Sequence, residues 1–156
     1  MLSIGDVVTA EVISVQVFGV FCRYASREML VVIPETSWIA SFNSCLQFAA
    51  VGDELEVIVL NIDHPTGKVA ASVKAIHPDP WENGTIVVGK LYETKVVRFV
   101  ESADRADHQP GYLMELVPGG YAMIPAENRQ LPIGQTIVVR LLAADFRHRS
   151  VIVGWA

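Results

Sequence analysis

The sequence predicts an all-β protein built from two five-stranded Greek-key barrels in tandem, and three observations lead to this fold. Apolar and polar residues alternate with a period of two in several short runs, which is typical of half-buried strands. Glycine, proline and aspartate bound these runs, as turn residues do between strands. The same order of signals then returns about 80 residues later, which indicates an internal repeat.

In the first half, the alternation is clearest where Val8, Ala10 and Val12 are separated by polar residues, and where Leu55 and Val57 follow Glu54 and Glu56. Strands are expected near residues 6–15, 18–24, 29–33, 54–63 and 67–74. A short helical turn within 35–48 is expected to link the third strand to the fourth. Five short strands with one helical insertion are typical of a Greek-key barrel.

The repeat sets the expected domain boundaries. Gly52 precedes Asp63 by eleven residues, and Gly134 precedes Asp145 by the same interval. Between the two copies, two prolines and Gly84 break both helix and strand, so this stretch is expected to be a linker. The predicted division is a first barrel over 1–77, a linker over 78–84 and a second barrel over 85–156.

Charge limits how the chain could bind nucleic acid. The net charge is −5, with a balance of −4 in residues 1–77 and −1 in residues 78–156. Proteins that bind nucleic acid through a broad phosphate-binding surface tend to be basic. Any such affinity is therefore expected to come from a local site where bases stack on aromatic rings.

Other features of the composition point to a globular cytoplasmic protein. Hydrophobic residues make up 51% of the chain, but no run approaches the roughly 20 apolar residues that cross a bilayer. No signal peptide is visible, because no basic region precedes an apolar run at the N-terminus. The two cysteines, Cys22 and Cys45, are too few for a disulfide framework and lack metal-ligand spacing.

The first half resembles the RNA-binding repeat of the ribosomal protein S-one family. The resemblance rests on six pieces in the correct order, namely Ile4-Gly5-Asp6-Val7-Val8, Phe18-Gly19-Val20-Phe21, Val51-Gly52-Asp53-Glu54-Leu55, Asp63 with Gly67-Lys68, Ser72-Val73-Lys74 and Pro78-Asp79-Pro80-Trp81. It implies an OB-type barrel that binds single-stranded RNA on one face. Trp81, at the end of the repeat, is expected to pack on the first barrel or between the barrels, and Trp38 is expected to be a lid on the barrel.

The resemblance assigns the RNA-binding residues to the first barrel. Phe18 and Phe21 match the family's stacking aromatics, and a bulge or bend at Gly19 is expected to bring both exposed rings to one face. On residue type alone, burial of one or both rings in the core is the alternative. Lys68 stands where the family usually has arginine, and keeps the positive charge for a phosphate. Asp63 could hold that cation or accept from a base, or it could simply initiate a turn.

Two departures from the family pattern concern this same face. Val32 replaces a histidine and Pro34 replaces a serine, so a stacking and hydrogen-bonding group is lost. Arg23 could compensate in part, although an arginine at a strand edge is often only a solvated charge.

The second half is a degenerate copy in which the paired phenylalanines are missing. Arg147 and Arg149 belong to its densest basic cluster and are candidates for phosphate contacts. The alternative is a hairpin end held by ion pairs beside Asp145. The polar loop over 101–110 is expected to be solvated and mobile.

The sequence carries no catalytic motif, no metal-ligand pattern and no signal for a cofactor. It therefore predicts a non-enzymatic protein that binds single-stranded RNA with weak sequence preference, in translation or RNA metabolism. The alternative is an interaction module that docks on the ribosome or another protein through barrels that have lost RNA binding. An exposed apolar patch in place of a basic, aromatic one would favour docking.

Overall fold

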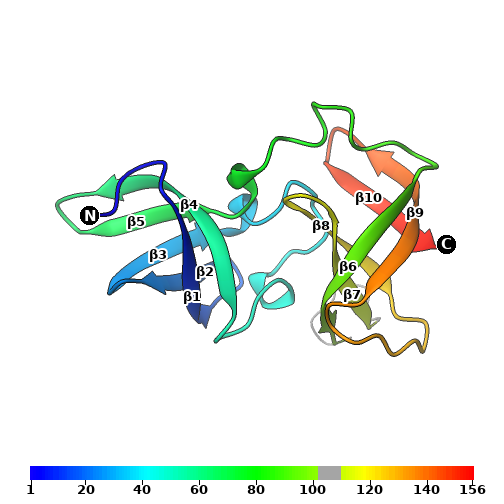
Figure 1. Cartoon of the computed structure of the whole chain (residues 1–156), viewed down its shortest axis with the longest axis horizontal. Helices are drawn as coiled ribbons and strands as arrows, with labels where there is room; N and C mark the ends of the chain where they lie inside the picture. The colour runs from blue at the N-terminus through cyan, green and yellow to red at the C-terminus, as the bar shows by residue number, and fades with distance from the viewer. Residues whose placement is uncertain (102–109) are drawn as a thin grey trace.

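The computed structural model describes residues 1–101 and 110–156 and holds two five-stranded sheets that lie side by side (Figure 1). The first contains β1 (Val7–Val15), β2 (Gly19–Tyr24), β3 (Arg27–Val32), β4 (Glu54–Asp63) and β5 (Lys68–Ser72). The second contains β6 (Leu91–Val100), β7 (Gly111–Val117), β8 (Gly120–Pro125), β9 (Thr136–Asp145) and β10 (Ser150–Trp155). The predicted all-β fold of two tandem OB-type barrels is confirmed. Most of the polar loop expected to be mobile, residues 102–109, lies outside the described residues.

The first sheet closes on itself as a barrel in the order β1-β2-β3-β5-β4. Closure comes from a short parallel pairing of β3 with β5, in which Met29 lies opposite Val69 and Leu30 opposite Ala70. The predicted helical turn between the third and fourth strands is present as two 3-10 helices, η1 (Ile33–Glu35) and η2 (Cys45–Gln47). A third, η3 (Lys74–Ile76), follows β5.

The second sheet repeats this topology without the parallel pairing. Its order is β10-β9-β6-β7-β8, so β6 to β10 take the places of β1 to β5 and β8 and β10 form the two ends. The indole Nε1 of Trp155 on β10 donates to the carbonyl oxygen of Pro125 on β8 at 3.1 Å. A side chain therefore links the two strands that a backbone ladder joins in the first barrel.

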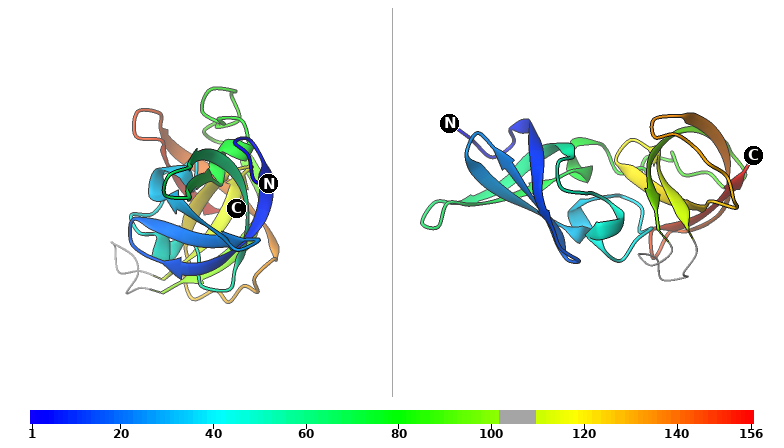
Figure 2. Two further views of the ribbon diagram at one scale, coloured as in Figure 1. Left: turned by 90° about the vertical axis from the view of Figure 1, so that its left-hand side faces the viewer. Right: turned by 90° about the horizontal axis from the view of Figure 1, so that it is seen from below.

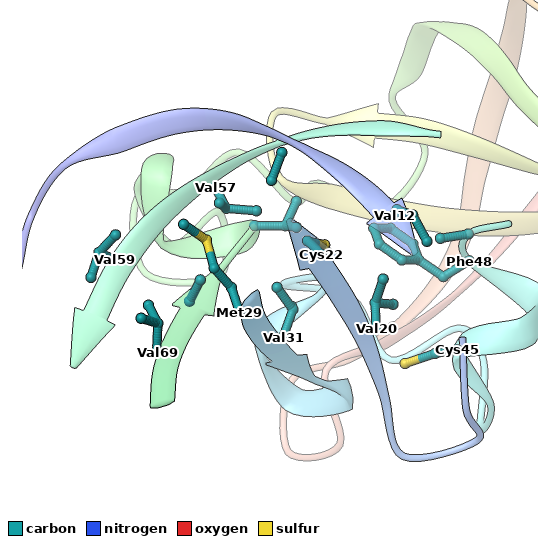
Figure 3. Packing of buried hydrophobic residues seen from close by; sticks show 14 of the residues in the cluster. Val12, Val20, Cys22, Met29, Val31, Cys45, Phe48, Val57, Val59 and Val69 are labelled. Carbon is teal, nitrogen blue, oxygen red and sulfur yellow. The ribbon is translucent and has the colours of Figure 1, made fainter. Parts of the chain in front are cut away.

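The core of the first barrel follows from the strand alternation. Val20 and Cys22 on β2 and Met29 and Val31 on β3 point inward and are buried, because successive side chains of a strand face opposite sides. Figure 3 shows them with Val57, Val59 and Val69 from β4 and β5, and with Cys45 and Phe48 at one end of the barrel. The two-residue alternation of apolar and polar side chains that predicts the strands therefore also determines which side chains face the core.

Both thiols of this core should be unreactive in the folded protein. Cys22 and Cys45 are fully buried, and burial raises the pKa of each to about 11. The thiolate is the nucleophile, so folded protein at about pH 8 is expected to react with a disulfide reagent only after opening. We expect two thiols to react in denaturant and almost none in its absence. Rapid labelling of native protein would contradict this packing.

The two barrels are joined by a stretch of the first that we call the bridging segment (residues 36–49). Its backbone donates from Trp38 to the Gly119 carbonyl at 2.9 Å and from Ala40 to the Arg149 carbonyl at 2.8 Å. Figure 2 (right) shows this segment reaching from the first sheet toward the second. The bridging segment ties both halves together by hydrogen bonds, and the division at 78–84 stays a prediction.

Trp81 lies between the barrels, as the sequence predicted. It is buried in the cluster that forms the second core, and its Nε1 donates to the carbonyl oxygen of Trp38 at 2.7 Å. Trp38 itself is half-buried at the same junction and packs against the second core, where the sequence suggested a lid on the first barrel. Without the second barrel, the indole rings of Trp38 and Trp81 would be more exposed, because residues of the second core pack against both.

Candidate functional site

The outer face of β2, β3 and β5 is hollowed into an open groove of about 850 Å³. The alternation that buries Val20 and Cys22 turns Phe21 outward, and the neighbouring strands present Leu30 and Ala70 beside it. The groove also contacts the end of β4 and the turn that follows. Its further lining residues include Glu28, Val32, Glu35, Leu60, Asn61, Asp63 and Lys68.

The predicted aromatic pair lies outside the barrel core, where Phe21 lines the groove and Phe18 contacts the Phe21 ring. Phe18 occupies a bend just before β2 and is 54% exposed. Phe21 is half-buried, less exposed than expected, because it packs between Phe18 and its cross-strand partner Leu30. The two ring centroids are 6.0 Å apart at 88°, an edge-to-face arrangement that leaves one large ring open to solvent.

The expected bulge at Gly19 is not where the strand irregularity lies. The register shift between β1 and β2 falls between Val12 and Ser14 on β1. Gly19 serves another purpose, since a Cβ there would lie 2.8 Å from Cδ1 of Leu30 and 3.0 Å from the carbonyl oxygen of Val31. Glycine thus allows close packing of β2 on β3, and the exposure of Phe18 comes from its position before the strand.

The charged side chains of the groove are mixed in sign. Lys68 is exposed and lies opposite Asp63 in the β4–β5 register. A carboxylate oxygen of Asp63 accepts from the Thr66 hydroxyl at 2.6 Å, and the Asp63 carbonyl accepts from the Gly67 amide at 2.7 Å. Asp63 therefore builds the turn that presents Lys68, which corresponds to the turn alternative.

Arg23 is exposed on the same outward side of β2 as Phe21, two residues further along. Its guanidinium lies 3.5 Å from Glu28 on β3, and both side chains are more than half exposed. Such an exposed pair contributes little to stability, so Arg23 can leave Glu28 at small cost. Arg23 is available at the edge of the groove.

The strand register shows which residues of the second barrel correspond to the groove. Val12 faces Cys22 before the shift and Ser14 faces Phe21 after it, while Val96 faces Met114 and Arg98 faces Leu113 in the same pattern. Leu113 therefore occupies the position of Phe21. By the same comparison of β3 and β8, Met123 corresponds to Leu30 and Tyr121 to Glu28.

This equivalent face of the second barrel is covered by the first barrel. Leu113 is completely buried in the cluster formed by the first core, and Tyr121 and Met123 pack against that cluster. The Phe48 ring of the bridging segment lies 5.2 Å from the Tyr121 ring, edge-to-face. Ser41 donates its hydroxyl to the Tyr121 carbonyl at 2.6 Å. The face that forms a groove in the first barrel is an internal contact in the second.

Tyr121 shows how closely this contact is packed. Burial and the neighbouring Glu115 carboxylate both raise the pKa of the Tyr121 hydroxyl. Its backbone amide also donates to the hydroxyl of Ser37 at 2.8 Å. An exposed nucleic-acid-binding ring would not have these contacts.

The two arginines named for the second barrel lie apart from its covered face. Arg149 donates to Asp79 at 2.7 Å across the junction between the barrels, and Arg147 is exposed in the β9–β10 turn. Asp145 pairs with Ser150 in the register as Asp63 pairs with Lys68, so Ser150 takes the lysine's place.

The β9–β10 turn is held by local hydrogen bonds around Asp145. His148 bonds the Asp145 carboxylate through its side chain and backbone, and these contacts lower the pKa of Asp145. Arg149 takes the left-handed conformation, φ 55°, that Gly67 has in the first barrel. These contacts match the alternative of a hairpin end held by ion pairs.

The described part of the chain has no metal-ligand cluster and no membrane-spanning helix. Over residues 1–101 and 110–156, no group of three or more His, Cys, Asp or Glu side chains could hold a metal ion. No helix of these residues is long and apolar enough to cross a membrane.

Several groove residues escaped the sequence reasoning. Leu30, Asn61 and Ala70 line the groove, yet they belong to strands whose outward positions look unremarkable in sequence. The alternation on β3, where Glu28, Leu30 and Val32 share one side, could have identified Leu30. Asn61 lines the groove because of a register shift in β4, and no local sequence pattern predicts that shift.

The chain is similar in sequence to bacterial ribosomal proteins. It is 29% identical to small ribosomal subunit protein bS1 of Streptococcus pneumoniae over 92% of this chain and 37% of that protein. A bS1 homologue of Bacillus cereus is 28% identical over 94% of this chain and 39% of that protein. The chain thus spans about two fifths of the length of these relatives, and the family resemblance is confirmed. No protein-family model matches the chain.

Similarity extends to proteins with other names. The 4-hydroxy-3-methylbut-2-enyl diphosphate reductase of Clostridium acetobutylicum is 26% identical over 94% of this chain and only 23% of that enzyme. Among solved structures, GSP13 from Bacillus subtilis is 25% identical and covers 56% of this chain and 73% of its own, with a TM-score of 0.45. That TM-score is too low to support a functional conclusion.

Proposed function

We propose that this chain, a homologue of ribosomal protein bS1 over most of its length, is a non-catalytic module that binds single-stranded RNA with weak sequence preference through its first barrel. The observation that carries the proposal is that Phe21 and Lys68 line one open groove, while the exposed Phe18 ring packs edge-to-face on Phe21. An exposed ring beside a cation is the combination by which OB-type barrels hold single strands.

Each side chain has a distinct role in the proposed site. Phe18, the more exposed ring, stacks on a base. Phe21 packs edge-to-face against Phe18 and offers its remaining surface to a second base. Lys68 contacts a phosphate, and the Asp63–Thr66 hydrogen bond holds the turn that positions it. Arg23 supplies a further cation at the groove edge. Stacking tolerates every base, which accounts for weak sequence preference.

The proposed setting is the cytoplasm, in translation or RNA metabolism. The support comes from relatives named as proteins of the small ribosomal subunit. The chain matches only part of each relative, so the ribosome is a proposed partner here.

A fluorescence-anisotropy titration with single-stranded RNA at several salt concentrations tests the proposal. Each phosphate contact to a single strand contributes about 0.7 to the slope of log affinity against log salt. For an oligomer of about 4 nucleotides, with Lys68 and Arg23 as the cations of the site, we expect measurable binding with a slope no steeper than about −1.4. Absence of binding at low salt would contradict the proposal, and a much steeper slope would shift the site to a basic surface elsewhere.

A second candidate function is docking of a protein segment in the same groove. The observation in its favour is the lining, where Glu28, Glu35 and Asp63 outnumber Lys68 and most remaining contacts are apolar. Such a surface fits a peptide with apolar and basic side chains. Binding to ribosomal subunits that survives an excess of single-stranded RNA oligomer, but not the loss of Phe18, would favour docking over RNA binding.

A further inference from the structure

A second hollow of about 290 Å³ lies where the two barrels meet. It is separate from the groove, and it is lined by residues of η1, the bridging segment, η3 and the β9–β10 turn. The members used below are Trp38, Lys74 and Arg149. We call this hollow the junction cleft.

The aromatic wall of the junction cleft is rigidly held. The Nε1 of Trp38 donates to the Lys74 carbonyl at 2.8 Å and to the His77 carbonyl at 3.2 Å. The backbone of Trp38 is held in addition by Gly119 and by the Trp81 indole. Two hydrogen bonds hold the indole and two hold the backbone, so the position of Trp38 in the wall of the cleft is well defined.

Two cations lie against this ring. The Nζ of Lys74 is 4.4 Å from the centroid of Trp38, and the guanidinium of Arg149 is 5.9 Å from it. Arg149 is already paired with Asp79, and the His148 ring beside it with Asp145. Across residues 1–101 and 110–156, no carboxylate forms an ion pair with Lys74. The half-buried ammonium of Lys74 makes a cation–π contact with the Trp38 ring.

The junction cleft adjoins the groove through one short element. Val32 and Glu35, at the two ends of η1, line the groove, whereas Ile33, Pro34 and Thr36 line the cleft. Only this single turn of 3-10 helix separates the two hollows. A single-stranded nucleic acid that leaves the groove across η1 therefore reaches Lys74 next.

We propose that the junction cleft is a second subsite for the same single-stranded nucleic acid, in which Lys74, held against Trp38, binds a backbone phosphate. The inference rests on the proposed function, because it needs a strand bound at Phe18 and Phe21. Arg149 contributes a weaker attraction, since Asp79 shares its charge. Trp38 and Lys74 belong to the first half of the chain, and the second barrel adds His148 and Arg149 to the cleft. The second barrel thus extends the binding surface of the first without using its own covered face.

The test uses two lengths of single-stranded RNA and one charge-removing substitution. Oligomers of about 4 and about 12 nucleotides span the range of site sizes of one OB-type barrel. Lys74→Gln removes the charge and keeps most of the stem. Lys90→Gln is the matched control, because Lys90 also lies over an aromatic ring, 5.2 Å from Tyr92, but outside the cleft.

We expect Lys74→Gln to weaken binding of the longer oligomer about fivefold at 0.1 M salt and to reduce its salt slope by about 0.7, as for one lost phosphate contact. The short oligomer, and the Lys90→Gln variant with either oligomer, should be unaffected. Equal binding of the long oligomer by wild type and Lys74→Gln, with the short oligomer still bound, would overturn the cleft subsite alone. Failure of wild type to bind either oligomer would overturn the proposed function and this inference together.

Discussion

Replacing Phe18 and Phe21 together by alanine is expected to weaken binding of single-stranded RNA by about 30-fold or more. Base–aromatic stacking contributes about 1–3 kcal/mol per base in alanine substitutions, so two rings contribute at least about 2 kcal/mol. Phe18 is largely exposed and Phe21 is half-buried outside the core, so the barrel should remain folded. Anisotropy titration gives the affinity, and a denaturant melt of the same sample gives the stability.

The control variant is Arg147→Ala, which removes an exposed cation of the second barrel. Among the described residues, no carboxylate forms an ion pair with Arg147. Arg149 is unsuitable because its guanidinium bonds Asp79. Exposed charges are screened within about 8 Å at physiological salt, whereas stacking is not. The difference in RNA affinity loss between the two variants should therefore grow as the salt concentration rises. A larger loss for Arg147→Ala would move the site to the second barrel. No loss for either variant would favour protein docking.

Phe48→Ala is expected to lower the free energy of unfolding by about 3–5 kcal/mol, as other buried phenylalanines do when truncated. Phe48 is nearly fully buried at the end of the first core, where it stacks on Phe42 with centroids 5.5 Å apart. Its edge-to-face contact with Tyr121 joins that core to the covered face of the second barrel. Its loss should therefore destabilise both the first barrel and the docking of the second. Urea denaturation followed by tryptophan fluorescence measures the effect.

Leu46→Ala is the control for this variant, because Leu46 lies in η2, the 3-10 helix that ends just before Phe48, and is about half exposed. We expect it to cost less than about 1 kcal/mol, as surface substitutions usually do. Similar losses for Phe48→Ala and Leu46→Ala would show that the bridging segment does not hold the barrels together.

The strands of the first barrel were predictable because their signal is local. Alternation such as Val8, Ala10 and Val12 needs only one buried face, and the first barrel supplies one. β7 lacks this pattern, since Tyr112 and Met114 enter the second core while Leu113 enters the first. Burial on both sides gives a continuous apolar run, and the packing partners of its outward side come mainly from the first barrel. The covered face could not be inferred from that run alone.

The candidate site was predictable to the same extent. Phe18, Phe21 and Lys68 were found through the family resemblance, and the meeting of Phe21 and Lys68 at one groove follows from the closure of β3 on β5. The partial burial of Phe21 and the turn role of Asp63 depend on side-chain packing that sequence does not specify. Trp38 and Lys74 are not identified as a site from sequence, because folding brings together residues that lie 36 positions apart.

RNA is proposed to bind the outer face of the first barrel, whereas the equivalent face of the second barrel is covered by the first. NMR titration of the isotope-labelled protein with a single-stranded RNA oligomer distinguishes the two faces. We expect large chemical-shift changes around Phe18, Phe21, Leu30, Lys68 and Ala70, and none at Leu113 and Met123. Changes concentrated on β7 and β8, with the first-barrel groove silent, would contradict this proposal.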